Sequence, residues 1–193
     1  ERGMTMTALI KVYVADLGAY NEGKIRGVWV DLPADIEELD KVIAQCTRDG
    51  EGDYAIHDYE LSPLINNLEI QEDFDLRKLN ETALWLEELD GDELLILNQL
   101  LDETGKGLQD YALEQGLTYI CNKEYTLHTD IQSYKDLGYY FVEELEGLDL
   151  ENISFIITDN LNFESIGKDY LQLASVTSFF VPDLGYVEFS GCI

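Results

Sequence analysis

Apolar and polar residues alternate in the first third of the chain, which is the pattern of half-buried strands. Two such segments cover residues 9–15 and 25–31, and a third covers residues 54–57. Asp35 precedes a segment in which apolar residues recur every three to four positions, the spacing of an amphipathic helix. We therefore predict a small three-stranded sheet with one helix in this part of the chain.

The middle third has helical spacing throughout, in three short segments. Asn80 and Asp92 are expected to cap the first two segments, and the second is expected to stop at Gly105. The third is expected to stop at Gly116, because glycine commonly follows the last turn of a helix. We therefore predict a small bundle of short amphipathic helices.

The last third mixes both patterns. Apolar and polar residues alternate over residues 125–129, as in a strand. Ser133 and Asn162 each precede a segment with the apolar spacing of a helix. Residues 179–189 contain two strand-like runs around Pro-Asp-Leu-Gly, which is typical of a hairpin turn. Residues 153–157 fit either a strand or a buried helix.

Together these patterns predict an α+β fold, built as an elongated chain of three small units. Residues 9–66 are expected to form the three-stranded sheet plus helix, and residues 67–122 the acidic helical bundle. Residues 123–193 are expected to form a mixed α/β unit.

The charge of the chain is its most unusual property. There are 40 Asp and Glu residues against 12 Lys and Arg, which gives a net charge of −28. The three predicted units hold 12 acids and 5 bases, 14 and 3, and 13 and 3, so the excess is spread along the whole chain. Like charges destabilise a compact state, and this charge is far beyond what solubility requires. Adaptation to high salt is the alternative explanation, because halophilic proteins reach similar charge, although they usually have fewer large aromatic residues than the 12 Tyr and 7 Phe of this chain. The excess therefore points to a function.

A chain with this charge repels nucleic acid and is attracted to the basic clefts of other proteins. Duplex DNA carries about one charge per 1.7 Å, so a net charge of −28 matches roughly 48 Å of duplex. We predict that the protein takes the place of DNA in a basic groove and does not bind nucleic acid directly. The predicted partner-binding surface acts collectively and consists of Glu69, Glu72, Asp73, Asp75, Glu87, Glu88, Asp90, Asp92, Glu93, Asp102, Glu103, Asp110, Glu114, Glu143, Glu144 and Glu146.

Catalytic motifs are scarce in this sequence. It has no Gly-rich phosphate loop, dinucleotide fingerprint or nucleophile elbow. His57 and His128, the two histidines, lie in predicted strands and are expected to be structural. An enzyme that used one of the many carboxylate pairs would need a buried acid in a cleft. We expect no catalytic residue, no cofactor and no enzyme activity.

One segment has part of the spacing of a calcium-binding EF-hand loop. Asp49, Glu51, Asp53 and Glu60 occupy ligand positions of such a loop. However, Tyr54 stands where the sharp turn requires glycine. We therefore expect no specific metal site.

The cysteines and the apolar runs indicate the compartment. Cys46, Cys121 and Cys192 are odd in number and far apart, which is typical of reduced thiols rather than a disulfide framework. The apolar run of residues 8–15 contains Lys11 and is much shorter than the roughly 20 residues that span a bilayer. We expect a cytoplasmic protein without membrane contact.

Three blocks of the sequence are typical of one known family. Residues 12–33 contain Val-Tyr-Val-Ala-Asp-Leu-Gly-Ala-Tyr-Asn-Glu-Gly and Gly-Val-Trp-Val-Asp-Leu-Pro, and residues 54–60 read Tyr-Ala-Ile-His-Asp-Tyr-Glu. Both blocks resemble the N-terminal signature of the ArdA antirestriction proteins. Residues 162–170 are similar to the family's Tyr-Glu-Ala-aromatic-Gly-Arg-Asp-Leu motif and depart from it at Ile166, Lys168 and Tyr170.

The resemblance implies a function. ArdA proteins are carried on plasmids and conjugative transposons, resemble bent duplex DNA and occupy the DNA-binding groove of type I restriction–modification enzymes. The resemblance thus implies an antirestriction protein whose partner is the methyltransferase and specificity core of such an enzyme. The alternative is an acidic interaction module or chaperone for another basic DNA- or RNA-binding protein.

The resemblance also implies a homodimer joined through the C-terminal domain. The implied dimer contact consists of the strand at residues 125–129 and an aromatic stretch of the following helix. The residues concerned are Tyr125, Leu127, Thr129, Tyr139, Tyr140 and Phe141. A second interpretation, in which the three consecutive aromatic residues belong to the core, stays open.

Overall fold

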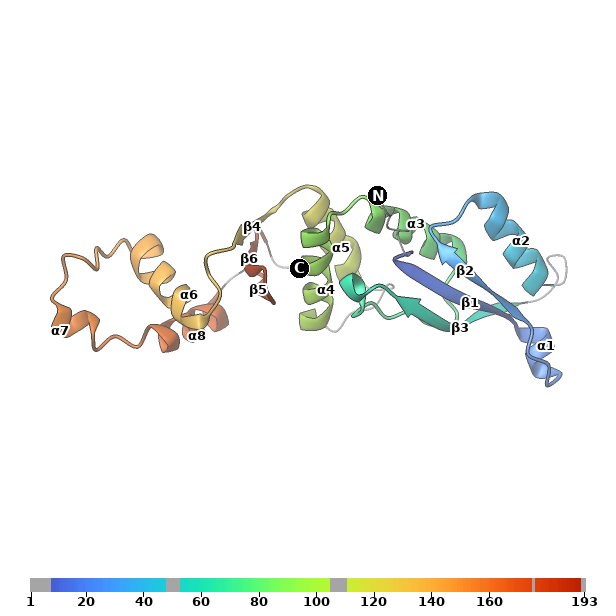
Figure 1. Cartoon of the computed structure of the whole chain (residues 1–193), viewed down its shortest axis with the longest axis horizontal. Helices are drawn as coiled ribbons and strands as arrows, with labels where there is room; N and C mark the ends of the chain where they lie inside the picture. Colours follow the sequence, from blue (N-terminus) through green and yellow to red (C-terminus); the bar gives the residue numbers. More distant parts are fainter. Residues whose placement is uncertain (1–7, 48–52, 105–110, 175, 192–193) are drawn as a thin grey trace, which may run out of the picture. The chain divides into compact units, whose positions relative to one another are not determined.

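The computed structural model describes residues 8–47, 53–104, 111–174 and 176–191, and for residues 111–115 it describes only the backbone (Figure 1). The chain divides into two compact units, Glu1–Leu113 and Glu114–Ile193. The division into three domains by sequence stays a prediction.

The N-terminal unit begins with the predicted three-stranded sheet. Its strands are β1 (Ile10–Asp16), β2 (Gly27–Leu32) and β3 (Tyr54–Leu61). They are antiparallel in the order β2-β1-β3, with Val12 of the central strand opposite Val30. Buried and half-buried residues alternate from Ile10 to Val14 in β1, which confirms the strand pattern.

Helix α2 (Ile36–Cys46) packs against β1 and β2, as Figure 1 shows. Its buried residues are Leu39, Val42 and Cys46, whereas Ile36, its first residue, is exposed. A short helix, α1 (Leu17–Asn21), follows β1 directly. The Asp16 carboxylate caps it by accepting a hydrogen bond from the Ala19 amide at 2.8 Å.

A 3-10 turn, η1 (Pro63–Ile65), leads to the helices α3 (Leu76–Glu87) and α4 (Gly91–Thr104). The predicted caps were wrong for both helices, because Asp75 caps α3 and Asp90 caps α4.

Asn80 lies inside α3 and is buried, so it is not a cap. Its side chain accepts a hydrogen bond from the Ala34 amide at 2.7 Å and donates one to the Ala34 carbonyl at 3.1 Å. It therefore joins the helix to the segment between β2 and α2.

Helix α5 (Tyr111–Cys121) continues through Gly116, so the predicted stop at this glycine was wrong. Leu117 and Ile120 follow the glycine, lie three positions apart and are both buried. Burying one such side chain stabilises by about 1.5–3 kcal/mol, which outweighs the roughly 1 kcal/mol that glycine costs inside a helix.

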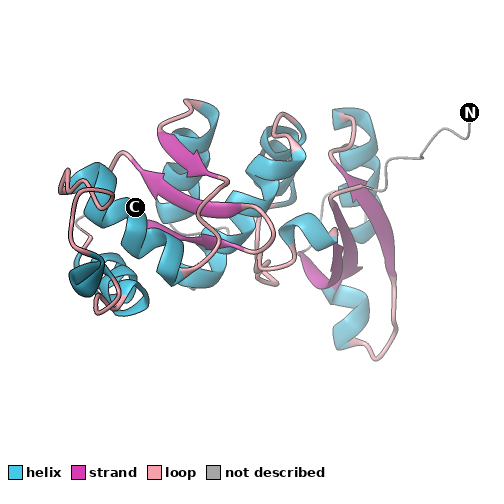
Figure 2. Ribbon diagram, turned by 60° about the vertical axis from the view of Figure 1, so that its left-hand side comes forward, coloured by secondary structure: helices cyan, strands magenta, loops and turns pink. Residues whose placement is uncertain are grey.

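The C-terminal unit contains the second sheet, formed by β4 (Tyr125–His128), β5 (Ser178–Val181) and β6 (Gly185–Phe189). The hairpin of β5 and β6 confirms the prediction from the Pro-Asp-Leu-Gly tetrad. The order β4-β6-β5 places β4 at an edge, antiparallel to β6. Figure 2 shows the strands of both sheets in magenta.

Helix α6 (Tyr134–Tyr140) continues into a π-helical turn, η2 (Phe141–Leu145), and α8 (Phe163–Leu173) packs against α6. Ser133 and Asn162 cap α6 and α8 as predicted, by accepting hydrogen bonds from the amides three residues later.

Glycine lets α6 and α8 approach each other closely. A Cβ atom at Gly138 would clash with the Phe163 carbonyl, and one at Gly167 would clash with the Tyr134 carbonyl. The two helices therefore cross with a glycine of each against the backbone of the other.

Helix α7 (Phe155–Thr158) occupies the segment that fitted either a strand or a buried helix. It is helical, but its Phe155, Ile156 and Ile157 side chains are exposed, so the expected burial was wrong. With helices and two antiparallel sheets in the described residues, the α+β fold class is confirmed.

Candidate partner-binding surface

Most of the predicted surface carboxylates are exposed. Of the sixteen predicted positions, Asp110 lies outside the described residues, and the side chain of Glu114 is not described. The exposed members are Glu69, Glu72, Asp73, Asp75, Glu87, Glu88, Asp90, Asp92, Asp102, Glu103, Glu143, Glu144 and Glu146.

The prediction that Glu93 belongs to the acidic surface was wrong, because only 4% of this residue is exposed. Its carboxylate accepts a hydrogen bond from the Asp90 amide at 3.0 Å, and the Asp90 carboxylate accepts one from the Glu93 amide at 2.9 Å. This reciprocal pair is a capping box at the start of α4. Glu93 therefore belongs to the architecture of the helix and not to its acidic surface.

The turn between α3 and α4 presents a dense group of carboxylates on one short segment. Glu87 and Glu88 end α3, and Asp90 and Asp92 begin α4; all four side chains are exposed. In the described part of the chain, no lysine or arginine forms an ion pair with any of these four residues. Their negative charge is therefore open to an external partner.

Four exposed acids of the predicted surface lie at the carboxyl ends of α3 and α4, where they oppose helix stability. The carboxyl end of a helix carries partial negative charge, so an acid there is unfavourable and a base is favourable. Glu87 and Glu88 occupy the end of α3, and Asp102 and Glu103 lie in the last turn of α4. Across the described helices, the last turn holds no basic residue. The acidity here is therefore not explained by the stability of the fold.

Several basic residues of the N-terminal unit pair with acids outside the predicted surface. Arg77 donates to the Asp40 carboxylate at 2.6 Å, and the Nζ atom of Lys24 lies 3.1 Å from the Glu22 carboxylate. Lys11 lies over the ring of Trp29 at 5.5 Å and 3.9 Å from Glu60. These basic residues therefore do not neutralise the charge of the carboxylates in the predicted surface.

A second group of exposed acids, Glu143, Glu144 and Glu146, lies in and just after η2 of the C-terminal unit. Residues 136–167 contain eight acids and no Lys, Arg or His. No basic residue therefore interrupts the acids along this segment of the C-terminal unit.

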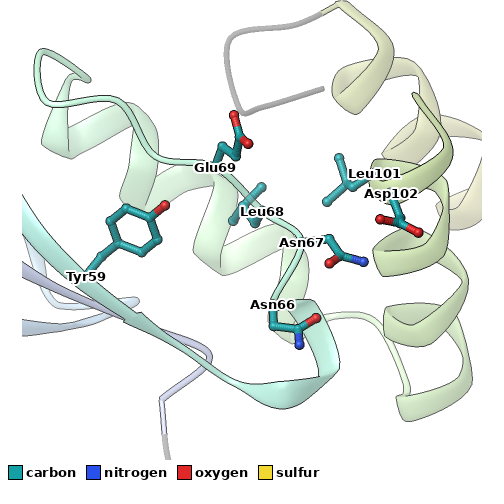
Figure 3. A pocket seen from close by; sticks show the side chains of 7 residues that line it. All are labelled: Tyr59, Asn66, Asn67, Leu68, Glu69, Leu101 and Asp102. Carbon is teal, nitrogen blue, oxygen red and sulfur yellow. The ribbon is translucent and has the colours of Figure 1, made fainter. Parts of the chain in front are cut away.

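A surface depression of about 340 Å³ lies in the N-terminal unit (Figure 3). Figure 3 shows that its lining comes from β3, from the segment after η1 and from α4. The residues are Tyr59, Asn66, Asn67, Leu68, Glu69, Leu101 and Asp102. Its two carboxylates, Glu69 and Asp102, are exposed. They therefore lack the burial on which a carboxylate-pair enzyme depends.

Asn98 of α4 fixes the position of Asn67, one of the residues that line this depression. The Asn67 amide donates to its side-chain oxygen at 2.8 Å, and the Asn67 side chain donates to its carbonyl at 3.0 Å.

His57 and His128 lie in β3 and β4, as predicted. The His57 ring contacts the Tyr20 ring edge-on at 4.9 Å. The His128 ring lies 4.8 Å from Tyr140, and its Nε2 atom lies 3.6 Å from the Glu188 carboxylate. None of these contacts places a histidine against the side chain of a serine, threonine or cysteine nucleophile.

Glu188 also accepts hydrogen bonds from the Tyr170 and Tyr186 hydroxyls, at 2.8 and 3.0 Å. Burial is the largest cause that raises the pKa of both phenols, and the Glu188 carboxylate raises it further. The two tyrosines therefore stay protonated donors. This network holds α8 to β6.

The described ranges are residues 8–47, 53–104, 111–174 and 176–191. Within these ranges, no three His, Cys, Asp or Glu side chains lie together in a way that could hold a metal ion. Asp49 and Glu51 of the EF-hand-like spacing lie outside these ranges, and Glu60 lies in β3. Among the described helices, none combines the length and apolar character that crossing a bilayer requires.

The aromatic residues implied in the dimer contact all make contacts within the chain. The Tyr139 ring stacks on Phe163 at 3.9 Å, and Phe141 lies 5.1 Å from Tyr170. Tyr140 is half-buried and Tyr139 is exposed on one side. On β4, Tyr125 and Leu127 are half-buried, and Thr129 follows the strand at an exposed position.

The comparison with known families decides what kind of protein carries this surface. A family model described as "Antirestriction protein (ArdA)" matches residues 12–188. The chain belongs to the ArdA family of antirestriction proteins. The match confirms the resemblance found in the sequence. A search of curated proteins finds no match.

The ArdA-like motif at residues 162–170 forms most of α8, and its contacts explain several of its residues. Phe163 and Gly167 are buried against α6, and Tyr170 donates to Glu188. Lys168 is exposed and forms an ion pair with Glu164 at 2.6 Å. In this chain the motif therefore builds the α6–α8 crossing, a role that the sequence pattern alone did not reveal.

Proposed function

We propose that this ArdA protein inhibits type I restriction–modification enzymes by taking the place of DNA in their binding groove. The observation that carries the proposal is the set of exposed carboxylates at the carboxyl ends of α3 and α4, where they oppose the helix dipole and form no ion pair with a basic residue of the described chain. DNA-binding grooves hold lysine and arginine that neutralise phosphates, so a dense row of carboxylates competes for the same groups.

The carboxylates act collectively in this proposal. None of them needs a special pKa or a fixed orientation, because affinity rests on summed electrostatic attraction. The inhibitor has no catalytic residue and no cofactor. Its partner is the methyltransferase and specificity core of the enzyme, and blocking that groove prevents restriction, with modification blocked to the extent that both use the same DNA site.

We further propose that the working form is an elongated homodimer joined through the C-terminal unit. The edge position of β4 supports this, because an edge strand presents backbone groups that a second copy can pair with. Tyr125, Leu127 and Thr129 would line this contact. A dimer would roughly double the 48 Å of duplex that the charge of one chain matches.

The test is a titration of the protein into a type I restriction–modification enzyme that is bound to labelled specific DNA, at two salt concentrations. We expect stoichiometric release of DNA that weakens as salt rises, because salt screens the competing charges. Absence of release at low salt would overturn the proposal for this enzyme class.

The competing function is that of an acidic chaperone for a basic protein. It differs in one measurable respect, because a chaperone need not exclude DNA from the partner's binding site. Formation of a ternary complex of inhibitor, enzyme and DNA would favour the chaperone over the DNA mimic.

A further inference from the structure

Helix α7 presents apolar side chains that no part of the described chain covers. Phe155, Ile156 and Ile157 are 71%, 63% and 55% exposed, although consecutive large apolar residues on a short helix are costly to leave in water. Figure 1 shows α7 at the end of the C-terminal unit away from its sheet. Contiguous exposed apolar side chains of this kind mark interaction sites.

The backbone of α7 is held by local hydrogen bonds. The Ser154 carbonyl accepts a bond from the Ile157 amide at 2.8 Å, and the Asn160 side chain donates to the Ile156 carbonyl at 2.6 Å. The Phe155 carbonyl accepts a bond from the Asp159 amide at 2.8 Å. The apolar side chains are thus displayed on an ordered turn, which lowers the entropy that docking would cost.

The charge around α7 determines which occupant fits. Residues 143–160 contain six acids and no Lys, Arg or His, and all six acids are exposed. A second copy docking here would bring two such segments together, and like charges at an interface cost several kcal/mol. An anionic lipid surface and nucleic acid are repelled for the same reason. A protein with an apolar pocket inside a basic surface fits both properties.

We propose that α7 is an apolar anchor that inserts into a pocket beside the basic groove of the restriction enzyme. This inference rests on the proposed function and goes beyond it, since DNA phosphates have no counterpart to these side chains. Charge attraction weakens with salt, whereas apolar burial does not. The anchor therefore supplies affinity that persists at high salt.

The test compares two triple variants in the DNA-release titration with a type I restriction–modification enzyme. The first carries Phe155→Ser, Ile156→Ser and Ile157→Ser. The matched control carries Ile25→Ser, Ile36→Ser and Leu173→Ser, which removes side chains that are 89%, 68% and 82% exposed elsewhere on the chain. Both variants keep every charged residue.

We expect the α7 variant to bind about tenfold or more weakly at both salt concentrations. Its salt dependence should stay unchanged, and the control should behave as the wild type. A conservative variant with leucine at the three α7 positions should recover most of the affinity, because it keeps the apolar area.

Three outcomes would overturn the inference. Equal release by the α7 variant and the wild type would remove the anchor and leave the proposed function standing. A loss of self-association by the α7 variant, seen by sedimentation, would show that a second copy covers α7. No release by the wild type at low salt would overturn the proposed function, and this inference with it.

Discussion

At the residue scale, Glu93 shows why an acidic sequence does not reveal which carboxylates face a partner. With Asp92 as the expected cap, Glu93 would be the first residue of the helix and exposed. With Asp90 as the actual cap, it is the third residue, from which its carboxylate reaches back to the Asp90 amide. Asp90 and Asp92 are equally suitable caps by sequence, and only the packing of α4 decides which of them begins the helix.

We predict that Glu93→Ala lowers the free energy of unfolding by about 1 kcal/mol, because it removes one half of the capping box. Inhibition by the folded variant should be unchanged, since the side chain is buried. Urea denaturation measures the first effect and DNA release from the enzyme the second. Glu87→Ala is the control: stability should be unchanged or raised, and inhibition should weaken only slightly, because many carboxylates share the attraction.

Cys46 provides a prediction on pH. Burial first, and then the Asp16 carboxylate, raise the pKa of its thiol above the ordinary value, while Arg26 lowers it by less. A raised pKa means less thiolate at any pH below it, and the side chain is also shielded from reagents.

We expect iodoacetamide at about pH 8.5 to modify Cys46 at least tenfold more slowly than the half-buried Cys121 in the native protein. Mass spectrometry of the modified peptides measures the two rates, and in urea they should become similar. Comparable native rates would mean that the region around Val14, whose carbonyl accepts the Cys46 thiol hydrogen bond, opens readily.

At the element scale, periodicity predicted the strands and most helices, because one face of each is buried. It could not predict that β4 pairs with β6, since that pairing joins segments far apart in the chain. It also failed where tertiary contacts outweighed local preference, as at Gly116 inside α5 and Asn80 inside α3. The exposure of α7 could not be predicted either, because apolar composition normally indicates burial.

The end of α3 yields a prediction in which stability and inhibition change in opposite directions. Glu87→Gln with Glu88→Gln should raise the free energy of unfolding at low salt by about 0.3–1 kcal/mol for each residue, because two negative charges leave the carboxyl end of the helix. The same variant should release DNA from the enzyme less effectively.

The matched control is Glu37→Gln with Glu38→Gln in the first turn of α2, where acids favour the helix. This control removes the same charge and should lower stability. If both variants changed stability in the same direction, the helix-dipole explanation of the acidic surface would be wrong.

At the scale of the whole molecule, the collective nature of the surface can be tested by removing charge from two separate units. One variant carries Glu69→Gln, Glu72→Gln and Asp73→Asn in the N-terminal unit, and the other carries Glu143→Gln, Glu144→Gln and Glu146→Gln in the C-terminal unit. All six side chains are exposed, and none of them caps a helix.

If attraction is summed over the surface, each triple variant should weaken inhibition by a similar factor, and the two factors should multiply in the sixfold variant. The slope of log affinity against log salt should fall by about 0.9 for each lost carboxylate that faces a basic group of the partner. Complete loss with one triple variant and none with the other would instead place the function at a single acidic site. The spread of net charge over all parts of the sequence predicts the first result, because a localised site would not need a net charge of −28.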